Sequence, residues 1–235
     1  MAQLVLRVAS VRKETASTRI LRLDLDRAPF AFKAGQAAEI GPAEEPERVP
    51  YSIASSPEEA AASGQLEFLI KLHGDGRWGR GFDVPRRGSS LNVDGPAGRF
   101  TFPDAPDERR FLFIGGGTGI APLRSMIRHA LCRRQPGRMR LLYSARTAED
   151  FSYRRELRAL ARSGRLELTL TATREPSQGW RGGRGRITVA QLLPLVDEAA
   201  TLCFVCGPAS MVHDVPLFLQ ELGIEKKRIR IEEWE

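Results

Sequence analysis

The sequence predicts an antiparallel β-barrel followed by a doubly wound α/β domain with a parallel sheet. Up to about residue 103, short segments of alternating apolar and polar residues are separated by turn formers. From Arg110 onward, strand-like runs alternate with helix-like segments. The segment PDAPDERR between them is rich in proline and charge, as domain boundaries often are. We therefore expect domains at residues 1–103 and 108–235.

The first domain is predicted from three segments, QLVLRVASV, TRILRLDL and QLEFLIKL. In the third, Leu66, Phe68, Ile70 and Leu72 alternate with more polar neighbours, and the turn formers KAGQ and SGQ lie between segments. This pattern is typical of an antiparallel barrel or sandwich with one buried face per strand.

The second domain is predicted from repeated strand–helix units, which imply a mostly parallel sheet with helices on both faces. Its expected strands are RFLFIGG, RMRLLYSA, RLELTLTAT, TLCFVC and RIRIEEW, and its expected helices are PLRSMIRHALCRR, DFSYRRELRALARS, TVAQLLPLV and ASMVHDVPLFLQELG. In the last strand we expect Ile229 and Ile231 to face inward.

The formal net charge of +7, with 31 arginines and five lysines, attracts nucleic acid, acidic proteins and phosphorylated small molecules alike. The basic residues are scattered, without zinc-finger spacing, a basic helix or an RNA-binding aromatic signature, so we expect no nucleic-acid partner. No apolar run has the roughly 18–20 residues of a membrane span, and the start MAQLVLRVASVRKE lacks a signal-peptide core. Three cysteines do not make a disulfide framework. A cytoplasmic location is expected, and a monomer is favoured.

The stretch FIGGGTGIAPL contains four glycines in five positions, between a strand-like run and a helix-like segment. In open α/β sheets, ligands bind beyond the carboxyl ends of the strands, and such a turn lets a phosphate approach the N–H groups of a helix terminus. A tight turn without a ligand accounts poorly for four glycines. The spacing is neither G-x-G-x-x-G, because position 120 is isoleucine, nor a P-loop, so we expect a dinucleotide site of another lineage.

Five short motifs follow one another along the chain: PYSIASSP, GPAGRF, GGGTGIAP, CGP and EEW. Together they resemble the ferredoxin-NADP reductase superfamily over nearly the whole chain. The resemblance implies a barrel that binds FAD, an α/β domain that binds NADPH or NADH, and a flavin that accepts a hydride and releases electrons singly.

By the resemblance, Tyr51 stacks on the flavin ring, and the Ser52 hydroxyl bonds near N5. Cys206 lines the nicotinamide pocket, Glu232 joins Ser52 and Cys206 around the reacting atoms, and Trp234 covers the outer flavin face. The predicted catalytic residues are Ser52, Cys206, Glu232 and Trp234. Alternatively, Tyr51 and Ser52 are ordinary residues of an edge strand without a role in flavin binding, and Trp234 only packs against the last strand.

The full cofactor-binding set implied by the resemblance joins the flavin motif, the loop HGDGRWGRGF and the nicotinamide loops. It comprises Arg48, Pro50, Tyr51, Ser52, Ile53, Lys71, His73, Gly76, Arg77, Trp78, Gly116, Gly117, Thr118, Gly119, Pro122, Arg146, Arg174, Cys206, Gly207, Pro208, Met211 and Trp234.

The sequence departs from the family pattern twice at the expected pyrophosphate site. The family usually has an arginine two residues before the tyrosine, whereas here Val49 holds that place and Arg48 precedes it. Because neighbouring strand residues face opposite ways, either the strand is irregular at Pro50 or the clamp lies elsewhere. The loop HGDGRWGRGF lacks the usual serine or threonine, although its glycines offer backbone donors and Arg77 offers charge.

Cys203 and Cys206 form a C-x-x-C, which raises a metal or redox alternative. An offset of three on a strand puts the two side chains on opposite faces, so we expect Cys203 against a helix and Cys206 at the crevice mouth. No second cysteine pair or nearby histidine completes a metal site, so no metal is expected. His129 and His213 are expected to be structural or solvent facing.

Arg146 follows the strand RMRLLYSA, where an NAD-selective site often has a ribose-binding carboxylate. Thr173 and Arg174 follow the next strand and are expected to converge on the same ribose pocket as Arg146. Because arginines there suit an additional phosphate, we expect a preference for NADPH. Alternatively, these arginines are solvated, and Glu149 and Asp150 merely favour the start of a helix.

The motifs together favour electron transfer between NAD(P)H and an external one-electron carrier. The basic charge suits an acidic ferredoxin or flavodoxin as that carrier. The alternatives are a free-flavin reductase, the reductase component of an oxygenase, and a non-catalytic electron-transfer subunit.

Overall fold

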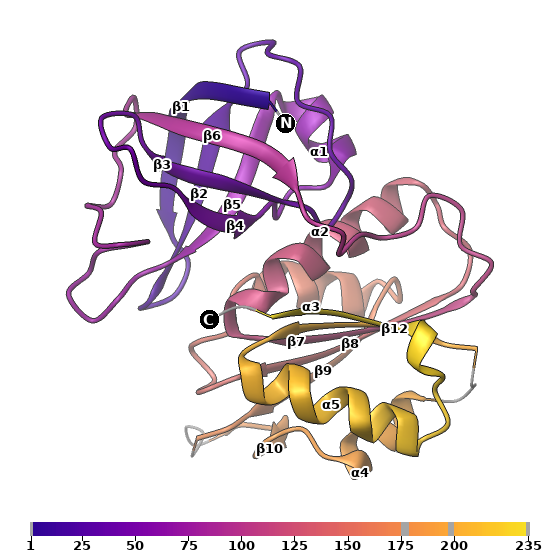
Figure 1. Cartoon of the computed structure of the whole chain (residues 1–235). Helices are drawn as coiled ribbons and strands as arrows, with labels where there is room; N and C mark the ends of the chain where they lie inside the picture. The colour runs from indigo at the N-terminus through magenta and orange to yellow at the C-terminus, as the bar shows by residue number, and fades with distance from the viewer. Residues whose placement is uncertain (1, 175–178, 197–199, 234–235) are drawn as a thin grey trace. The chain divides into compact units, whose positions relative to one another are not determined.

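The computed structural model describes residues 2–174, 179–196 and 200–233. The chain divides into two compact units (Figure 1). Unit 1 comprises residues 1–102 together with residues 124–133, and unit 2 comprises residues 103–123 and 134–235.

Unit 1 contains a six-stranded antiparallel sheet that curls into a near-barrel (Figure 1). Its strands are β1 (Ala2–Lys13), β2 (Thr18–Asp24), β3 (Ala37–Pro42), β4 (Val49–Ser52), β5 (Gln65–Lys71) and β6 (Ser90–Ala97), in the order β4-β3-β6-β1-β2-β5. The two end strands meet where Ile53 forms an antiparallel bridge with Phe68. The Ala54 N–H also donates to the Glu67 carbonyl at 2.7 Å. The predicted barrel is therefore confirmed.

The alternating residues of β5 fill the barrel core as predicted. Leu66, Phe68 and Ile70 are fully buried and pack with residues of β1, β2, β3 and β6. A short helix, α1 (Pro57–Ser63), was not predicted. Ser56 and Glu59 form a reciprocal capping box at its start, so the S-x-x-E spacing was the available signal.

Unit 2 contains a six-stranded parallel sheet with helices on both faces, which confirms the predicted α/β domain (Figure 1). Its strands are β7 (Arg110–Gly116), β8 (Arg138–Ala145), β9 (Glu167–Ala172), β10 (Gly183–Arg184), β11 (Leu202–Gly207) and β12 (Ile229–Glu233). Its helices are α3 (Arg154–Arg162), α4 (Val189–Leu192) and α5 (Ala209–Glu221), with 3-10 turns η1 (Gly117–Gly119), η2 (Leu193–Leu195) and η3 (Lys226–Arg228). A further helix, α2 (Ile120–Cys132), begins in unit 2, and its residues from Arg124 onward count with unit 1. The strand order is β10-β9-β8-β7-β11-β12.

From β7, the strands β8 and β9 extend the sheet to one side, and β11 and β12 extend it to the other. The order in which the strands are added therefore reverses between β7 and β11, although all of them run parallel. A crevice outside the carboxyl ends of the strands at such a switch point is where open α/β sheets bind ligands. Residues Leu112, Cys203 and Val205 face α5, whereas α3 lies on the other face (Figure 1).

The prediction that Ile231 faces inward is wrong. Its side chain is 47% exposed, because β12 is an edge strand, whereas Ile229 packs against the core beneath α5. None of the helices in the described part of the chain is long and apolar enough to cross a membrane.

Candidate functional site

The glycine-rich turn joins the end of β7 to the start of α2 through η1. A Cβ added to Gly119 would lie 2.3 Å from the Cys206 carbonyl oxygen, and one added to Gly116 would lie 2.7 Å from Met211 Cε. A Cβ on Gly115 would contact Leu123 at 3.0 Å. Three of the four glycines therefore make room for the chain itself.

Gly117 is the glycine that faces open space. It is exposed, its φ is +56°, and a Cβ there would meet nothing within 4 Å. A left-handed residue at the mouth of the turn leaves backbone N–H groups accessible at the start of a helix, where a phosphate is stabilised. The turn thus fits a dinucleotide phosphate, but mainly at one glycine. Gly119 allows η1 to approach β11, whereas Gly116 and Gly115 make room for Met211 and Leu123.

Tyr143 holds this turn in place, and it was not predicted. Its side chain is fully buried in β8, and its hydroxyl donates to the Gly117 carbonyl at 2.9 Å. The Ser152 N–H donates to the same hydroxyl at 3.2 Å. The tyrosine therefore links the glycine turn to the segment before α3. The sequence signal was only a tyrosine near the end of a buried strand.

The second predicted nicotinamide loop adjoins the glycine turn. Cys206 pairs with Gly115 on β7 and with Glu232 on β12 in the parallel register. Met211, in the first turn of α5, contacts both glycine positions, since Cβ atoms on Gly116 and Gly207 would each lie 2.7 Å from it. The structure thus brings these predicted residues together at the carboxyl ends of β7 and β11.

The two cysteines lie on opposite faces of β11, as predicted. Cys203 packs beneath α5, and burial raises the pKa of its thiol to about 12. Cys206, however, is fully buried rather than open at a crevice mouth, because the glycine turn lies directly against its carbonyl. Among the described residues, no group of three or more His, Cys, Asp or Glu side chains is placed to hold a metal.

Arg146 and Arg174 lie side by side at the carboxyl ends of β8 and β9. The Arg174 N–H donates to the Arg146 carbonyl at 2.8 Å, and the side chains of both residues are exposed. Asp150 accepts hydrogen bonds from the N–H and the hydroxyl of Thr147, so this carboxylate is used within the turn. The two arginines consequently present positive charge to solvent at this end of the sheet.

In unit 1, Ser52 stands at the end of β4 opposite Ala37. The residue is 5% exposed, and its Oγ is buried without a hydrogen-bond partner among the described residues. A buried hydroxyl left unsatisfied costs free energy, and native proteins rarely leave one without a role. This hydroxyl fits a polar atom of a bound flavin.

Tyr51 precedes it and is half-buried against the loop that follows β5. Its ring lies 5.7 Å from that of Trp78, and Trp78 is fully buried with its Nε1 donating to the Asp83 carbonyl. Burial raises the pKa of the Tyr51 phenol to about 12, although a hydrogen bond from the Gly79 backbone acts in the opposite direction. The predicted flavin-stacking residue is thus held by an aromatic cluster.

The loop HGDGRWGRGF is built around Trp78, which bridges Leu72 and Phe82. His73 Nε2 lies 2.7 Å from the Gly79 carbonyl, so this histidine bonds within the loop. A Cβ on Gly79, in this loop, would lie 3.1 Å from Val49. The valine at the usual arginine place therefore packs against this loop.

Arg48 contacts the turn before β4 and strand β6. Its guanidinium donates to the Glu45 carbonyl at 2.7 Å and lies 3.4 Å from the Asp94 carboxylate on β6. Its Nε is buried without a hydrogen-bond partner among the described residues, so one donor of the fork stays unused. That Arg48 reaches the flavin phosphates stays a prediction.

The remaining predicted residues take ordinary places near these groups. Arg77 is exposed, donates to the Gly81 carbonyl at 3.3 Å and lies 3.4 Å from the Asp83 carboxylate. Pro50, Lys71, Gly76 and Pro208 are exposed, Ile53 and Pro122 are buried, and Thr118 is half-buried. Trp234 lies outside the described residues.

Two residues of α2 that count with unit 1 support the segment after Ser52. Arg124, which is buried, donates to the Ala54 carbonyl at 2.7 Å, and the Ser125 hydroxyl donates to the Ser55 carbonyl at 2.7 Å. Burial alone would raise the pKa of Glu59, but Arg124, the Ser56 N–H and Arg128 together hold it below its usual value. These contacts hold the flavin motif in one conformation.

Two family models match the chain. The oxidoreductase FAD-binding domain matches residues 5–102, and the oxidoreductase NAD-binding domain matches residues 113–216. The first therefore covers the barrel with Tyr51 and Ser52, and the second covers the glycine turn and the loop at Cys206.

Curated and solved relatives cover nearly the whole chain. Ferredoxin--NADP reductase B of Sorangium cellulosum is 32% identical over 97% of this chain and 96% of its own length. The ferredoxin reductase component of the 3-ketosteroid-9-alpha-monooxygenase of Rhodococcus rhodochrous is 31% identical over 97% of this chain, which spans 64% of that protein. The crystal structure of the Amycolatopsis cytochrome P450 reductase GcoB aligns with a TM-score of 0.87 and 26% identity, over 99% of this chain and 69% of that one.

Proposed function

The chain belongs to the ferredoxin-NADP reductase superfamily of FAD- and NAD(P)-binding oxidoreductases, and on that premise we propose that it passes electrons from NAD(P)H to an external one-electron carrier. The carrier that we propose is an acidic ferredoxin or flavodoxin. The chain is an oxidoreductase that uses FAD and NAD(P)H, and the proposal concerns the acceptor and the residues that act.

The observation that carries the proposal is the buried, unpartnered Oγ of Ser52. When bound, FAD accepts the two electrons of a hydride and can return them singly. Ser52 would hydrogen-bond the reactive edge of the ring, and Tyr51 would pack against its face. Both groups are held by the strand pairing of β3 with β4 and by the Trp78 cluster, so their positions do not depend on a mobile loop.

The nicotinamide nucleotide would bind at the carboxyl ends of β7 and β11. The open N–H groups beside Gly117 would hold its phosphates, and Cys206 and Glu232, which are paired across β11 and β12, would line its reacting end. Positioning of this kind converts binding free energy into an oriented approach of two reactants.

An external carrier is supported by the relatives and by charge. Two of the similar proteins are named for ferredoxin reduction, and the net charge of +7 favours encounter with an acidic protein. The carrier remains a proposal for this chain.

A second function, reduction of free flavin, is favoured by the residues at the expected pyrophosphate site. Arg48 donates to the Glu45 carbonyl and lies 3.4 Å from Asp94, Val49 fills the usual arginine place, and the loop HGDGRWGRGF lacks the usual serine or threonine. Fewer groups than usual would then hold the pyrophosphate, which would suit a flavin that exchanges.

The test compares Ser52→Ala with Ser55→Ala. Anaerobic stopped-flow measurement with NADPH and NADH should show flavin reduction slowed by about tenfold or more in Ser52→Ala, with little change in melting temperature. Ser55 is a matched buried serine whose Oγ accepts from the Glu67 N–H, so its loss should cost about 1 kcal/mol of stability and leave the rate near wild type.

Wild-type rates in Ser52→Ala would contradict the assigned role. Gel filtration at moderate salt separates the two functions, because a retained yellow cofactor supports the carrier reductase. Complete loss of flavin, with rapid reduction of added free flavin, would support the second function instead.

A further inference from the structure

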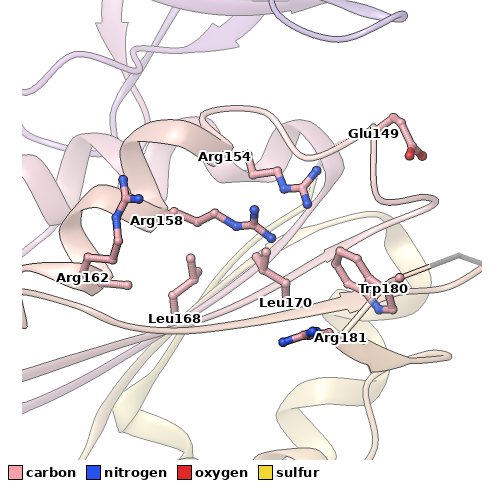
Figure 2. A pocket seen from close by; sticks show the side chains of 11 residues that line it. Glu149, Arg154, Arg158, Arg162, Leu168, Leu170, Trp180 and Arg181 are labelled. Carbon is pink, nitrogen blue, oxygen red and sulfur yellow. The ribbon is translucent and has the colours of Figure 1, made fainter. Parts of the chain in front are cut away.

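A basic groove lies between α3 and β9, and none of its lining residues belongs to the predicted cofactor-binding set. It has a volume of about 630 Å³ and is lined by one face of α3, by Leu168 and Leu170 of β9, and by residues 179–182 (Figure 2). Arg154 and Arg158 project from the helix toward Leu170 and Trp180, and Arg181 lies on the opposite side (Figure 2).

The groove carries an excess of positive charge. Its lining has four arginines, Arg154, Arg158, Arg162 and Arg181, and one acid, Glu149, whose charge acts on Arg154 (Figure 2). The side chains of Arg158, Arg162 and Arg181 make neither an ion pair nor a hydrogen bond in the part of the chain that the structure describes. An anion bound between these like charges would relieve their mutual repulsion.

Arg154 adds an unsatisfied donor at the helix end of the groove. Its guanidinium donates to the Ala148 carbonyl at 2.9 Å and lies 6.0 Å from the centre of the Trp180 ring, but its Nε is buried without a partner among the described residues. Burial, and then the charge of Arg158, lower the pKa of this guanidinium. Phe151 stacks on Trp180 at 5.4 Å, so this end of the groove is a fixed wall.

The spacing of the arginines matches an extended acidic chain better than a single phosphate. Arg154, Arg158 and Arg162 are four residues apart, so they form a row along one face of α3 with a rise of about 6 Å between successive positions. Alternate residues of an extended peptide are about 6.6 Å apart. Carboxylates at every second position would therefore each meet one arginine, and the side chains between them would turn the other way, toward Leu168 and Leu170.

The backbone of β9 offers a second feature that suits a peptide. One edge of β9 pairs with β8, and on the other edge β10 pairs only with Thr171 and Ala172. Before Thr171, none of the described strands pairs with that edge, although Gly182 lies against the Leu170 carbonyl, where an added Cβ would be 2.6 Å from the oxygen. An extended segment can bind such an edge through its main chain while its side chains meet the groove.

We propose that this groove binds an extended acidic segment of a partner protein, in which carboxylates alternate with apolar residues. The groove lies at the β9–β10 edge of the sheet, whereas the nicotinamide loops lie at β7 and β11. None of the residues that line the groove is among those assigned to the nucleotide, although Arg174 follows the same strand, β9. This inference does not depend on which acceptor takes the electrons.

The test uses a fluorescein-labelled peptide of alternating Glu and Leu, an isomer with its Glu residues contiguous, and sodium tripolyphosphate as a competitor. Fluorescence anisotropy with the full-length protein at low ionic strength should show that the alternating peptide binds more tightly than its isomer. Arg158→Gln and Arg162→Gln should each weaken binding at least about fivefold, since an exposed contact to carboxylate is worth about 1 kcal/mol or more. Arg155→Gln is the matched control, because Arg155 is an exposed arginine of α3 outside the groove, and it should change affinity less than about twofold.

Equal binding by Arg158→Gln, Arg162→Gln and the wild type would overturn the proposal. Equal binding of the two peptides, with stronger displacement by tripolyphosphate, would also overturn it and identify a phosphate-binding groove. Oxidation of NAD(P)H with a small artificial acceptor should be unchanged in Arg158→Gln, and its loss would contradict a groove separate from the nucleotide site.

Discussion

Single residues decide which nucleotide the chain should prefer. Arg146 and Arg174 are joined through their backbones at the ends of β8 and β9, and both side chains are exposed. The acidic residue Asp150 is occupied by Thr147, so it is not free to bind a ribose hydroxyl. This arrangement favours the additional phosphate of NADPH.

We expect NADPH to be used at least about tenfold better than NADH in kcat/KM, because a charge-assisted hydrogen bond to phosphate is worth about 1.5–3 kcal/mol. Arg146→Ala and Arg174→Ala should each erode this ratio by lowering kcat/KM for NADPH alone. Arg165→Ala serves as the control, since Arg165 is an exposed arginine in the loop before β9. Equal use of NADH by the wild type would mean that both arginines are merely solvated.

At the scale of elements, the glycine turn depends on the close approach of η1 to β11. The Cβ positions of Gly119 and Gly117 differ sharply, because the first would lie 2.3 Å from a backbone carbonyl and the second would meet nothing within 4 Å. The Tyr143 hydroxyl donates to the Gly117 carbonyl and so holds the turn close to β11.

Gly119→Ala should therefore lower the free energy of unfolding by about 1–3 kcal/mol or more, since β11 cannot move without disturbing the sheet. Gly117→Asn should cost about 1 kcal/mol or less, because asparagine tolerates a left-handed conformation and the added side chain has space. Thermal unfolding of the two variants makes the comparison. Similar losses in both would show that the turn tolerates a Cβ at position 119.

At the scale of the whole molecule, charge governs encounter with a carrier. The net charge of +7 and the pI of about 9.8 create a positive field that attracts acidic proteins at long range. Such steering is screened by salt over about 8 Å at physiological ionic strength.

We expect kcat/KM for an acidic ferredoxin to fall about tenfold or more between low and high salt. The rate with a small neutral acceptor should change by less than about twofold, because it lacks charge to steer. Steady-state assays with NADPH at several salt concentrations provide the measurement. A carrier rate that is independent of salt would argue against an acidic protein partner.

Local patterns in the sequence were sufficient for the fold. Alternation in QLEFLIKL predicts a strand with a buried face, and strand–helix repetition after Arg110 predicts a parallel sheet. The motif order predicts the two cofactor domains for the same reason, since each motif is a short run of neighbouring residues. The helix α1 was missed although its capping box was present in the sequence.

Features that depend on residues far apart in the chain required the tertiary structure. Four glycines in five positions look alike in sequence, yet the approach of Leu123, Met211 and Cys206 to the other three distinguishes Gly117 from them. Asp94, 46 positions after Arg48, decides where that guanidinium goes. The arginines of α3 form a groove only because β9 and residues 179–182 pack beside the helix. Sequence periodicity reports which face of an element is apolar, whereas packing decides which elements that face meets.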